Sequence, residues 1–290
     1  TKTRLPEPET FSRLCNDIFQ RAWLTNNGQC VQELERNLLE YLGVSHVLAC
    51  NNGTIALMLA LQCAGLAGKK VAVTPYTYVA TLSALLWLRC VPVFVDIEPD
   101  TLCLSPDIAG ALPVHIYGLA CDVERLDAVC REYGAVLIYD AAQAFGSRYH
   151  GKSLLEYGDY SICSFHATKI FHTAEGGCVV SHSADAHNAL SLARAFGHIN
   201  DTHYSLGING KMSELHAAMG LALLPGTNTE IERRKEARAA YDAALEGLPL
   251  QRPTIREGLD WNNAYYPVLL PDEDCRVRAE QTLKERGIHP

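Results

Sequence analysis

The middle of this chain alternates short apolar runs with stretches of helical periodicity. The apolar runs are rich in valine, isoleucine and leucine and show no polar alternation. They are SHVLAC from residue 45, KVAVTP from 70, VPVFVDI from 91, ALPVHIYG from 111 and AVLIYD from 135. Strands of this kind are buried on both faces, as in a parallel sheet covered by helices on both sides. We therefore predict an α/β fold with a mostly parallel central sheet.

Helical periodicity fills the gaps between these runs. Apolar residues at three-and-four spacing predict helices over 31–42, from Gly53-Thr54 onwards, over 78–89 and over 122–134. The composition changes at Pro225, where a charged helix over 228–247 precedes a strand at 264–270 and a helix over 274–287. A length of 290 residues favours about two domains. We expect a large α/β domain at 26–224 and a small α+β domain at 225–290, with 1–25 packing on the latter.

The charge and composition of the chain favour some classes of binding partner over others. The formal net charge of -8 disfavours electrostatic capture of nucleic acid or of an anionic membrane, which favours a small-molecule partner. No run of about 18 uncharged apolar residues is present, and the first residues lack the apolar core of a signal peptide. We therefore expect a cytoplasmic protein.

Cysteine and histidine are frequent but dispersed. The eleven cysteines form no CxxC pair, and we interpret them as reduced, buried thiols; examples are Cys50, Cys63, Cys90, Cys163 and Cys178. No HExxH pattern supports a metal site, so we interpret the histidines as structural and expect no metal; those considered are His115, His166 and His172.

Several polar residues follow the predicted strands. Open α/β sheets bind ligands beyond the carboxyl ends of their strands, which predicts one shared site. Its candidates are Gly53, Thr54, Tyr78, Asp140, Gln143 and Ser164.

Taken singly, each candidate has two interpretations. Gly53-Thr54 at a helix N-terminus favours an anion such as phosphate, but Asn51 or Asn52 there is equally consistent with an ordinary N-cap. Asp140, at a buried strand end, faces either a ligand or an internal partner. Lys169 is either an exposed turn lysine or a desolvated, nucleophilic amine.

Together, the lysine, the aspartate and the anion site are the parts that hold pyridoxal phosphate. The cofactor needs a lysine that bonds to its aldehyde, an acid beside its ring nitrogen and a cradle for its phosphate. The GxGxxG and GxxxxGK[ST] signatures of dinucleotide and triphosphate sites are absent from the sequence.

Several motifs, in order along nearly the whole chain, closely resemble the DegT/DnrJ/EryC1/StrS family of nucleotide-sugar aminotransferases, which have the aspartate aminotransferase fold (fold type I). They are NNGTIAL, TPYTYVAT, PVFVDIEPDT, PVHIYG, DAAQAFG and SFHATKIFHTAEGG. The resemblance implies a pyridoxal-phosphate enzyme with a large domain and a smaller α+β domain.

The resemblance also implies a role for each candidate. Lys169 would bond to the cofactor and move a proton, and Asp140 would keep the ring nitrogen protonated. The remaining assignments are Gln143 at the 3′-oxygen, Tyr78 on the ring face, Gly53, Thr54 and Ser164 on the phosphate, Asn209 on the phosphate of the neighbouring subunit, and His166 on the sugar side. Two chains would then build each site of a homodimer.

Similarity around GLACDVERL, LIYDAAQAFG and SFHATKIF favours the branch that aminates C-4 of dTDP-4-keto-6-deoxy-D-glucose with L-glutamate as donor, in deoxyamino-sugar biosynthesis. Amination at C-3 of a 3-keto sugar and a non-catalytic sensor that binds the cofactor stay open. The dehydratase branch has histidine in place of the lysine, so Lys169 argues against it.

The sequence departs from the family pattern at two places. Residues 102–118 are shorter than their usual counterpart, which affects a local helix but no predicted catalytic residue. Family members also continue beyond the segment KERGIHP, so we expect the small domain, and part of the sugar site, to be incomplete in this sequence.

Overall fold

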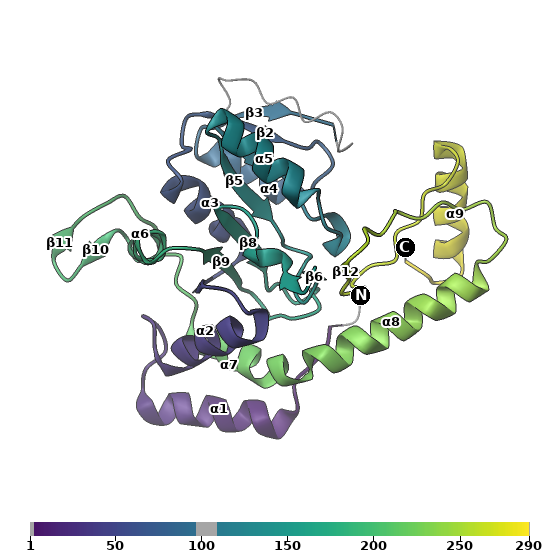
Figure 1. Cartoon of the computed structure of the whole chain (residues 1–290). Coiled ribbons are helices and arrows are strands. Elements are labelled where there is room, and N and C mark those ends of the chain that lie inside the picture. The colour runs from purple at the N-terminus through teal and green to yellow at the C-terminus, as the bar shows by residue number, and fades with distance from the viewer. Residues whose placement is uncertain (1–2, 97–108, 290) are drawn as a thin grey trace.

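A seven-stranded sheet forms the centre of the molecule. The computed structural model describes residues 3–96 and 109–289. The strand order is β1-β9-β8-β5-β4-β2-β3, and β9 runs antiparallel to both of its neighbours while the strands from β8 to β3 are parallel (Figure 1). The strands are β1 (His46–Cys50), β2 (Lys70–Val73), β3 (Val91–Phe94), β4 (Gly110–Leu112), β5 (Val136–Asp140), β8 (Tyr160–Ser164) and β9 (Gly177–Ser181). The predicted α/β class and the mostly parallel sheet are confirmed.

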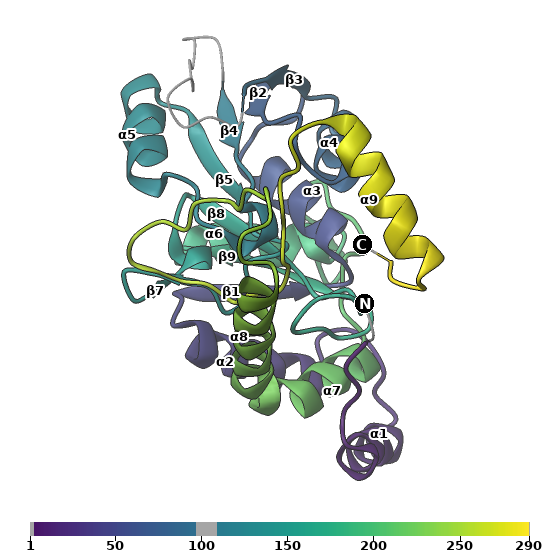
Figure 2. The same ribbon diagram turned by 90° about the vertical axis from the view of Figure 1, so that its right-hand side faces the viewer.

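Helices cover both faces of this sheet (Figure 2). Helices α2 (Gln29–Leu42) and α5 (Val123–Tyr133) pack on one face, and α3 (Gly53–Cys63), α4 (Val79–Trp87) and α6 (Ala184–Arg194) pack on the other. The four helices predicted from periodicity in this region are confirmed to within a few residues. Helix α7 (Glu214–Leu223) packs on α2, and α1 (Pro8–Arg21) packs on α7.

The C-terminal part differs in character, as its composition predicted. Helix α8 (Thr227–Ala244) leads away from α7 towards α9 (Glu273–Glu285), and both helices are almost entirely solvated. A small three-stranded sheet joins this part to the loop between β5 and β8 of the large sheet. Its strands are β12 (Leu259–Asp260), β6 (Arg148–Tyr149) and β7 (Lys152–Ser153). The division into two domains stays a prediction.

The strand predicted at 264–270 is wrong. Those residues contain only an isolated bridge between Gln251 and Leu269. The backbone of Ala264 is bonded instead by side chains, since its N–H donates to Oδ1 of Asn262 and its carbonyl accepts from Arg234. Side-chain bonds of this kind replace the ladder that a strand needs.

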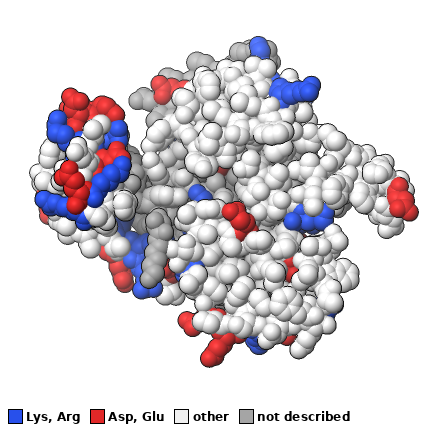
Figure 3. All heavy atoms as spheres, turned by 180° about the vertical axis from the view of Figure 1, so that it is seen from behind, with Lys and Arg blue, Asp and Glu red and all other residues white. Residues whose placement is uncertain are grey.

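A β-hairpin projects from the body of the molecule after α6 (Figure 1). It consists of β10 (His198–Ile199) and β11 (Thr202–His203). Figure 3 shows the molecule from behind, with the hairpin at its right edge, and the surface beside the hairpin carries few charged side chains in this view. The described ranges also contain three short 3-10 helices, at Ile116–Gly118, Leu154–Glu156 and Leu224–Gly226. In the described ranges, no helix is long and apolar enough to cross a membrane.

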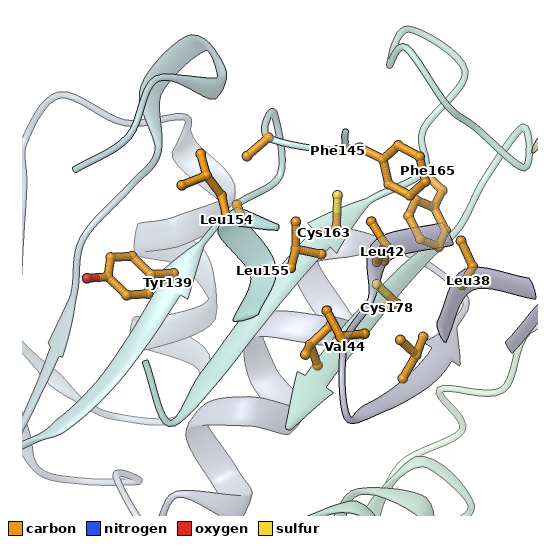
Figure 4. Close-up of a cluster of buried hydrophobic side chains, with 14 of the residues drawn as sticks. Leu38, Leu42, Val44, Tyr139, Phe145, Leu154, Leu155, Cys163, Phe165 and Cys178 are labelled. Atoms are coloured by element: carbon orange, nitrogen blue, oxygen red, sulfur yellow. The ribbon is translucent and has the colours of Figure 1, made fainter. Parts of the chain in front are cut away.

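Two buried clusters, one on each face of the sheet, form the core. The cluster under α2 and α5 includes Tyr139, Phe145 and Phe165 (Figure 4), and the other lies under α3, α4 and α6. Cys163 and Cys178 belong to the first cluster, and Cys50 and Cys90 to the second, as predicted, whereas Cys63 is partly exposed. Burial raises the pKa of the Cys50 and Cys163 thiols to about 12, so they pack as small apolar groups.

The last residue of the predicted strand from 91, and residues 102–108 of the segment that departs from the family pattern, lie outside the described ranges.

Candidate active site

Lys169 lies in the loop between β8 and β9. Its amide N–H donates to the carbonyl of His166 at 2.9 Å. Phe165 and Phe171 are fully buried on either side of it, and the ring of Phe171 stacks on that of Phe145 at 4.5 Å. These aromatic anchors hold the loop, so that the half-buried lysine lines a pocket together with Ala142, Gln143, Phe145, Thr168, Ile170, Ala264 and Tyr265.

Asp140 ends β5 and is 5% exposed. Its Oδ2 accepts from the hydroxyl of Thr81 at 2.8 Å, and its Oδ1 accepts from the N–H of Ala142 at 3.1 Å. Burial raises the pKa of this carboxyl, and the bonds from Thr81 and Ala142 and the positive charge of Lys169 oppose that rise. A buried acid beside the lysine is thus available to a cationic group of a ligand.

The N-terminus of α3 meets the end of β8. A Cβ placed on Gly53 would lie 2.9 Å from Cβ of Ser164, so only glycine allows this approach. The side chain of Asn52 caps α3 by accepting from the N–H of Ile55 at 2.8 Å. The N–H groups of Gly53 and Thr54 have no acceptor within the helix. They and the Ser164 hydroxyl can cradle an anion at the positive end of α3.

Gln143 and Tyr78 lie at the edge of this site. Oε1 of Gln143 accepts from the backbone N–H of Tyr117, and Gln143 lines the same pocket as Lys169. Tyr78 precedes the first residue of α4, its carbonyl accepts from the N–H of Thr81, and its ring is 75% exposed. The exposed ring is free to cover a planar ligand held by Asp140.

Asn209 and His166 are exposed. Oδ1 of Asn209 accepts from the amine of Lys211 at 2.7 Å, and its carbonyl accepts from the side chain of Asn51 at 3.4 Å. His166 lies on the Lys169 loop, with Nδ1 2.9 Å from the hydroxyl of Thr168 and Nε2 3.7 Å from the carboxylate of Glu175. The geometry therefore brings Lys169, Gln143 and Asp140 together and Gly53 beside Ser164, while Asn209 lies near the residue that precedes the α3 cap.

The other two histidines have structural roles, as predicted. Burial lowers the pKa of His115 to about 3, and its Nδ1 accepts from the N–H of Cys121 while its ring stacks on Tyr139 at 4.5 Å. Nε2 of His172 donates to the carbonyl of Arg4 at 2.7 Å.

Three site residues were not predicted as such. Thr81 and Tyr117 lie in the motifs TPYTYVAT and PVHIYG, so the sequence did mark their segments. Tyr265, whose hydroxyl accepts from the amine of Lys169 at 3.4 Å, comes from a segment predicted to be a strand. No local pattern signals a contact between residues so far apart in the chain.

This arrangement combines a primary amine, a buried carboxylate and an anion cradle in one site. An amine bonds to aldehydes and moves protons, a buried carboxylate stabilises a protonated ring nitrogen, and the cradle fits a phosphate. In the parts of the chain that the structure describes, no three histidine, cysteine, aspartate or glutamate side chains group so that they could hold a metal ion.

Comparison with known proteins agrees with this chemistry. The model of the DegT/DnrJ/EryC1/StrS aminotransferase family matches residues 7–289. The chain is 38% identical over 301 aligned residues to a dTDP-4-amino-4,6-dideoxy-D-glucose transaminase of Shigella dysenteriae, which covers 99% of this chain and 82% of that protein. It is 32% identical to a GDP-perosamine synthase of Vibrio cholerae, over 81% of this chain and 68% of the relative. Among solved structures, DesI in the presence of its TDP-sugar product superimposes with a TM-score of 0.91 at 32% identity, over 99% of this chain and 76% of DesI.

Proposed function

Because this chain belongs to the DegT/DnrJ/EryC1/StrS aminotransferase family, we propose that it transfers the amino group of L-glutamate to C-4 of dTDP-4-keto-6-deoxy-D-glucose, which yields dTDP-4-amino-4,6-dideoxy-D-glucose. The enzyme is a transaminase of nucleotide sugars, as its family is, and such transaminases depend on pyridoxal phosphate. The choice of this sugar is supported by the 38% identity to a relative named for its 4-amino product.

The observation that carries the proposal is that Lys169 lies near the buried carboxyl of Asp140. Lys169 lines a pocket with Gln143, and its charge acts on the pKa of Asp140. An amine that were merely structural would need no buried acid near it. The pair instead fits a ligand that has an electrophilic carbon at one side and a ring nitrogen at the other.

The residues present fit pyridoxal phosphate. Asp140 is buried, and among the residues that the structure describes its carboxylate accepts hydrogen bonds from two neutral donors, Thr81 and Ala142, so a protonated ring nitrogen would offset its burial. The close approach of Gly53 to Ser164 brings the Ser164 hydroxyl to the α3 N-terminus, where it and the helix N–H groups would bind a phosphate. When bound, the cofactor supplies an electron-withdrawing ring that stabilises negative charge on a substrate carbon.

The chain's own residues then have distinct tasks. Lys169 would hold the cofactor through its amine, and the free amine would move the proton to and from the reacting carbon. Asp140 holds the proton at the ring nitrogen. Gln143 binds the 3′-oxygen, and Tyr78 covers the ring face. Gly53, Thr54 and Ser164 bind the phosphate, and His166 contributes to the sugar side.

The substrate assignment is tested by product analysis. Purified protein supplied with pyridoxal phosphate, L-glutamate and dTDP-4-keto-6-deoxy-D-glucose should release 2-oxoglutarate and form the 4-amino sugar. The dTDP-3-keto-6-deoxy sugar, assayed at the same concentration, should react far more slowly. Turnover of the 3-keto sugar alone would contradict C-4 amination, and turnover of neither sugar would favour a sensor.

The role of Lys169 is tested by reduction with borohydride. Peptide mapping should find the pyridoxyl group on Lys169. Lys169→Ala should fold and bind the cofactor reversibly but carry no label and form no product. A label on another lysine would refute the assignment.

We also propose that two copies of the chain form a homodimer with shared sites. The hairpin β10–β11 projects from the body of its own chain (Figure 1), and the hairpin and its flanks expose large apolar side chains; the adjoining surface has few charges (Figure 3). They are Phe196, Ile199, Tyr204 and Leu206, which are between 47% and 74% exposed. Apolar surface of this kind supports association, and Asn209 lies at the base of the hairpin.

Mixing two inactive variants tests the shared site. Lys169→Ala and Asn209→Ala chains, unfolded and refolded together, should form mixed dimers that contain one intact site, with roughly a quarter of wild-type activity at random pairing. Activity that stays at the level of the separate variants would contradict a site built by two chains.

A further inference from the structure

The amine of Lys169 has a hydrogen-bond partner that comes from a distant part of the chain. Nζ donates to the hydroxyl oxygen of Tyr265 at 3.4 Å, and both residues line the same pocket with Gln143. Tyr265 lies 96 residues after the lysine, in the irregular segment that follows β12. The contact therefore depends on how this segment is fixed to the rest of the molecule.

The segment Trp261–Asn263, just before Tyr265, is held firmly against the residues that follow β5. Asn262 is fully buried; its Nδ2 donates to the carbonyls of Gln143 at 2.8 Å and Phe145 at 2.9 Å, and its N–H donates to the Ser147 hydroxyl at 3.1 Å. These bonds tie the backbone near Tyr265 to the very residues that carry Gln143.

Contacts with Tyr117 fix the segment from a second side. The indole N–H of Trp261 donates to the carbonyl of Tyr117 at 2.8 Å. The ring of Tyr117 lies against that of Tyr265, with centroids 5.5 Å apart. Gly118, at φ 81°, allows the close approach, because a Cβ there would lie 2.7 Å from the Gln143 carbonyl and 2.8 Å from Asn262. Both the backbone and the ring of Tyr265 are therefore constrained.

We propose that Tyr265 is a positioning residue that holds the free amine of Lys169 towards the reacting carbon. The inference rests on the proposed function, since Lys169 has a free amine whenever it is not bonded to the cofactor. A lysine side chain is flexible, and a fixed partner reduces the freedom that it must lose before it reacts. A tyrosine hydroxyl accepts from an ammonium and donates to a neutral amine, so it can hold Nζ both before and after Nζ takes a proton from the substrate carbon. Tyr265 keeps its own proton throughout.

The chain offers a matched control in the next residue. The hydroxyl of Tyr266 donates to Oδ1 of Asp242 at 2.9 Å, and its ring stacks on Tyr241. Tyr265→Phe and Tyr266→Phe each remove one hydroxyl from adjacent tyrosines, but only the first removes a partner of Lys169.

The test follows covalent capture of pyridoxal phosphate by apoprotein in a stopped-flow spectrophotometer. Tyr265→Phe should capture the cofactor roughly fivefold more slowly than wild type, with kcat lowered and KM for the sugar little changed, whereas Tyr266→Phe should match wild type. Borohydride mapping should still place the cofactor on Lys169 in all three proteins.

The outcomes separate the two proposals. Capture by Tyr265→Phe at the wild-type rate, with unchanged kcat, would overturn the role of Tyr265 and leave the proposed function standing. A slower rate in Tyr266→Phe as well would show a general effect of the segment and equally overturn it. Failure of wild type itself to capture the cofactor on Lys169 would instead refute the proposed function.

Discussion

The hydroxyl of Thr81 donates a hydrogen bond of 2.8 Å to Oδ2 of Asp140. Thr81 is fully buried near the start of α4, and its hydroxyl also lies 2.7 Å from that of Thr77. Since Oδ1 of Asp140 is bonded to the N–H of Ala142, both carboxylate oxygens are oriented by the protein itself. The acid is thus organised before a ligand arrives, which spares the reorganisation that binding would otherwise require.

Thr81→Val should weaken cofactor binding. The substitution keeps the volume but removes a donor that opposes the rise in the pKa of Asp140. Because a hydrogen bond to a charged group contributes about 1.5–3 kcal/mol, we expect the affinity for pyridoxal phosphate to fall roughly tenfold or more. Absorbance titration of apoprotein measures the dissociation constant. Thr81→Ser, which keeps the hydroxyl, should bind nearly as wild type, and equal affinity of all three would contradict this role.

Asp140→Asn should change how the stability of the apoprotein depends on pH. Burial raises the pKa of Asp140 in the folded state. As far as this carboxyl is concerned, wild type is therefore most stable below the unfolded pKa of about 4, where the group is protonated in both states. Wild type loses stability as pH rises through the folded pKa, because the buried carboxyl must then become charged. Asparagine does not titrate. The melting temperature of the variant minus that of wild type should therefore become more positive between about pH 4 and pH 8.

With saturating pyridoxal phosphate at neutral pH, wild type should melt at a higher temperature than Asp140→Asn. The reason is that a protonated ring nitrogen then offsets the charge of Asp140, which only wild type carries. Calorimetry of apoprotein and holoprotein over the same pH series checks both parts. If the difference in melting temperature between the two apoproteins does not change with pH, Asp140 does not carry a buried charge in the folded state.

The end of β5 was predictable from the sequence because AVLIYD is a continuous apolar run that stops at Asp140. Asp140 and Ser164 end the parallel neighbours β5 and β8, so strand order alone brings them to one edge of the sheet. The position of Tyr265 was not predictable. It depends on the hydrogen bonds of Asn262 to carbonyls more than a hundred positions earlier, and no periodic pattern encodes such contacts.

The sequence left two interpretations open at the start of α3; the structure confirms the N-cap, and the anion site stays a prediction. Asn52 is an ordinary N-cap, since it accepts from the N–H of Ile55. That bond uses the third N–H of the helix, and the N–H groups of Gly53 and Thr54 still point out of its end. A capped helix can therefore also bind an anion, which the residue types alone did not reveal.

Gly53→Ala should reduce affinity for the phosphate of the cofactor. The new Cβ would lie 2.9 Å from Cβ and 3.2 Å from the hydroxyl oxygen of Ser164, so one side of the cradle must move. We expect the affinity for pyridoxal phosphate to fall roughly tenfold or more, as when a charge-assisted bond is lost. Pyridoxal, which lacks the phosphate, serves as the control and should bind both proteins equally. A parallel loss of pyridoxal affinity would place the damage elsewhere in the site.

Glu214 should prove important for stability rather than for the reaction. It begins α7 and is fully buried, and its two carboxylate oxygens accept from the N–H groups of Cys30 at 2.9 Å and Val31 at 3.0 Å. These are donors in the first turn of α2, whose N-cap, Gly28, has no side chain to satisfy them. The carboxylate of one helix thus caps another.

Glu214→Gln should destabilise the apoprotein by about 2 kcal/mol, because the amide presents an N–H group to one of the two backbone donors and leaves that donor buried without a partner. Urea unfolding at neutral pH measures the loss. Glu232→Gln makes the same substitution at an exposed carboxylate on α8, 3.8 Å from Lys235, where we expect a change below about 0.5 kcal/mol. If the two variants unfold at the same urea concentration, the carboxylate of Glu214 does not stabilise α2.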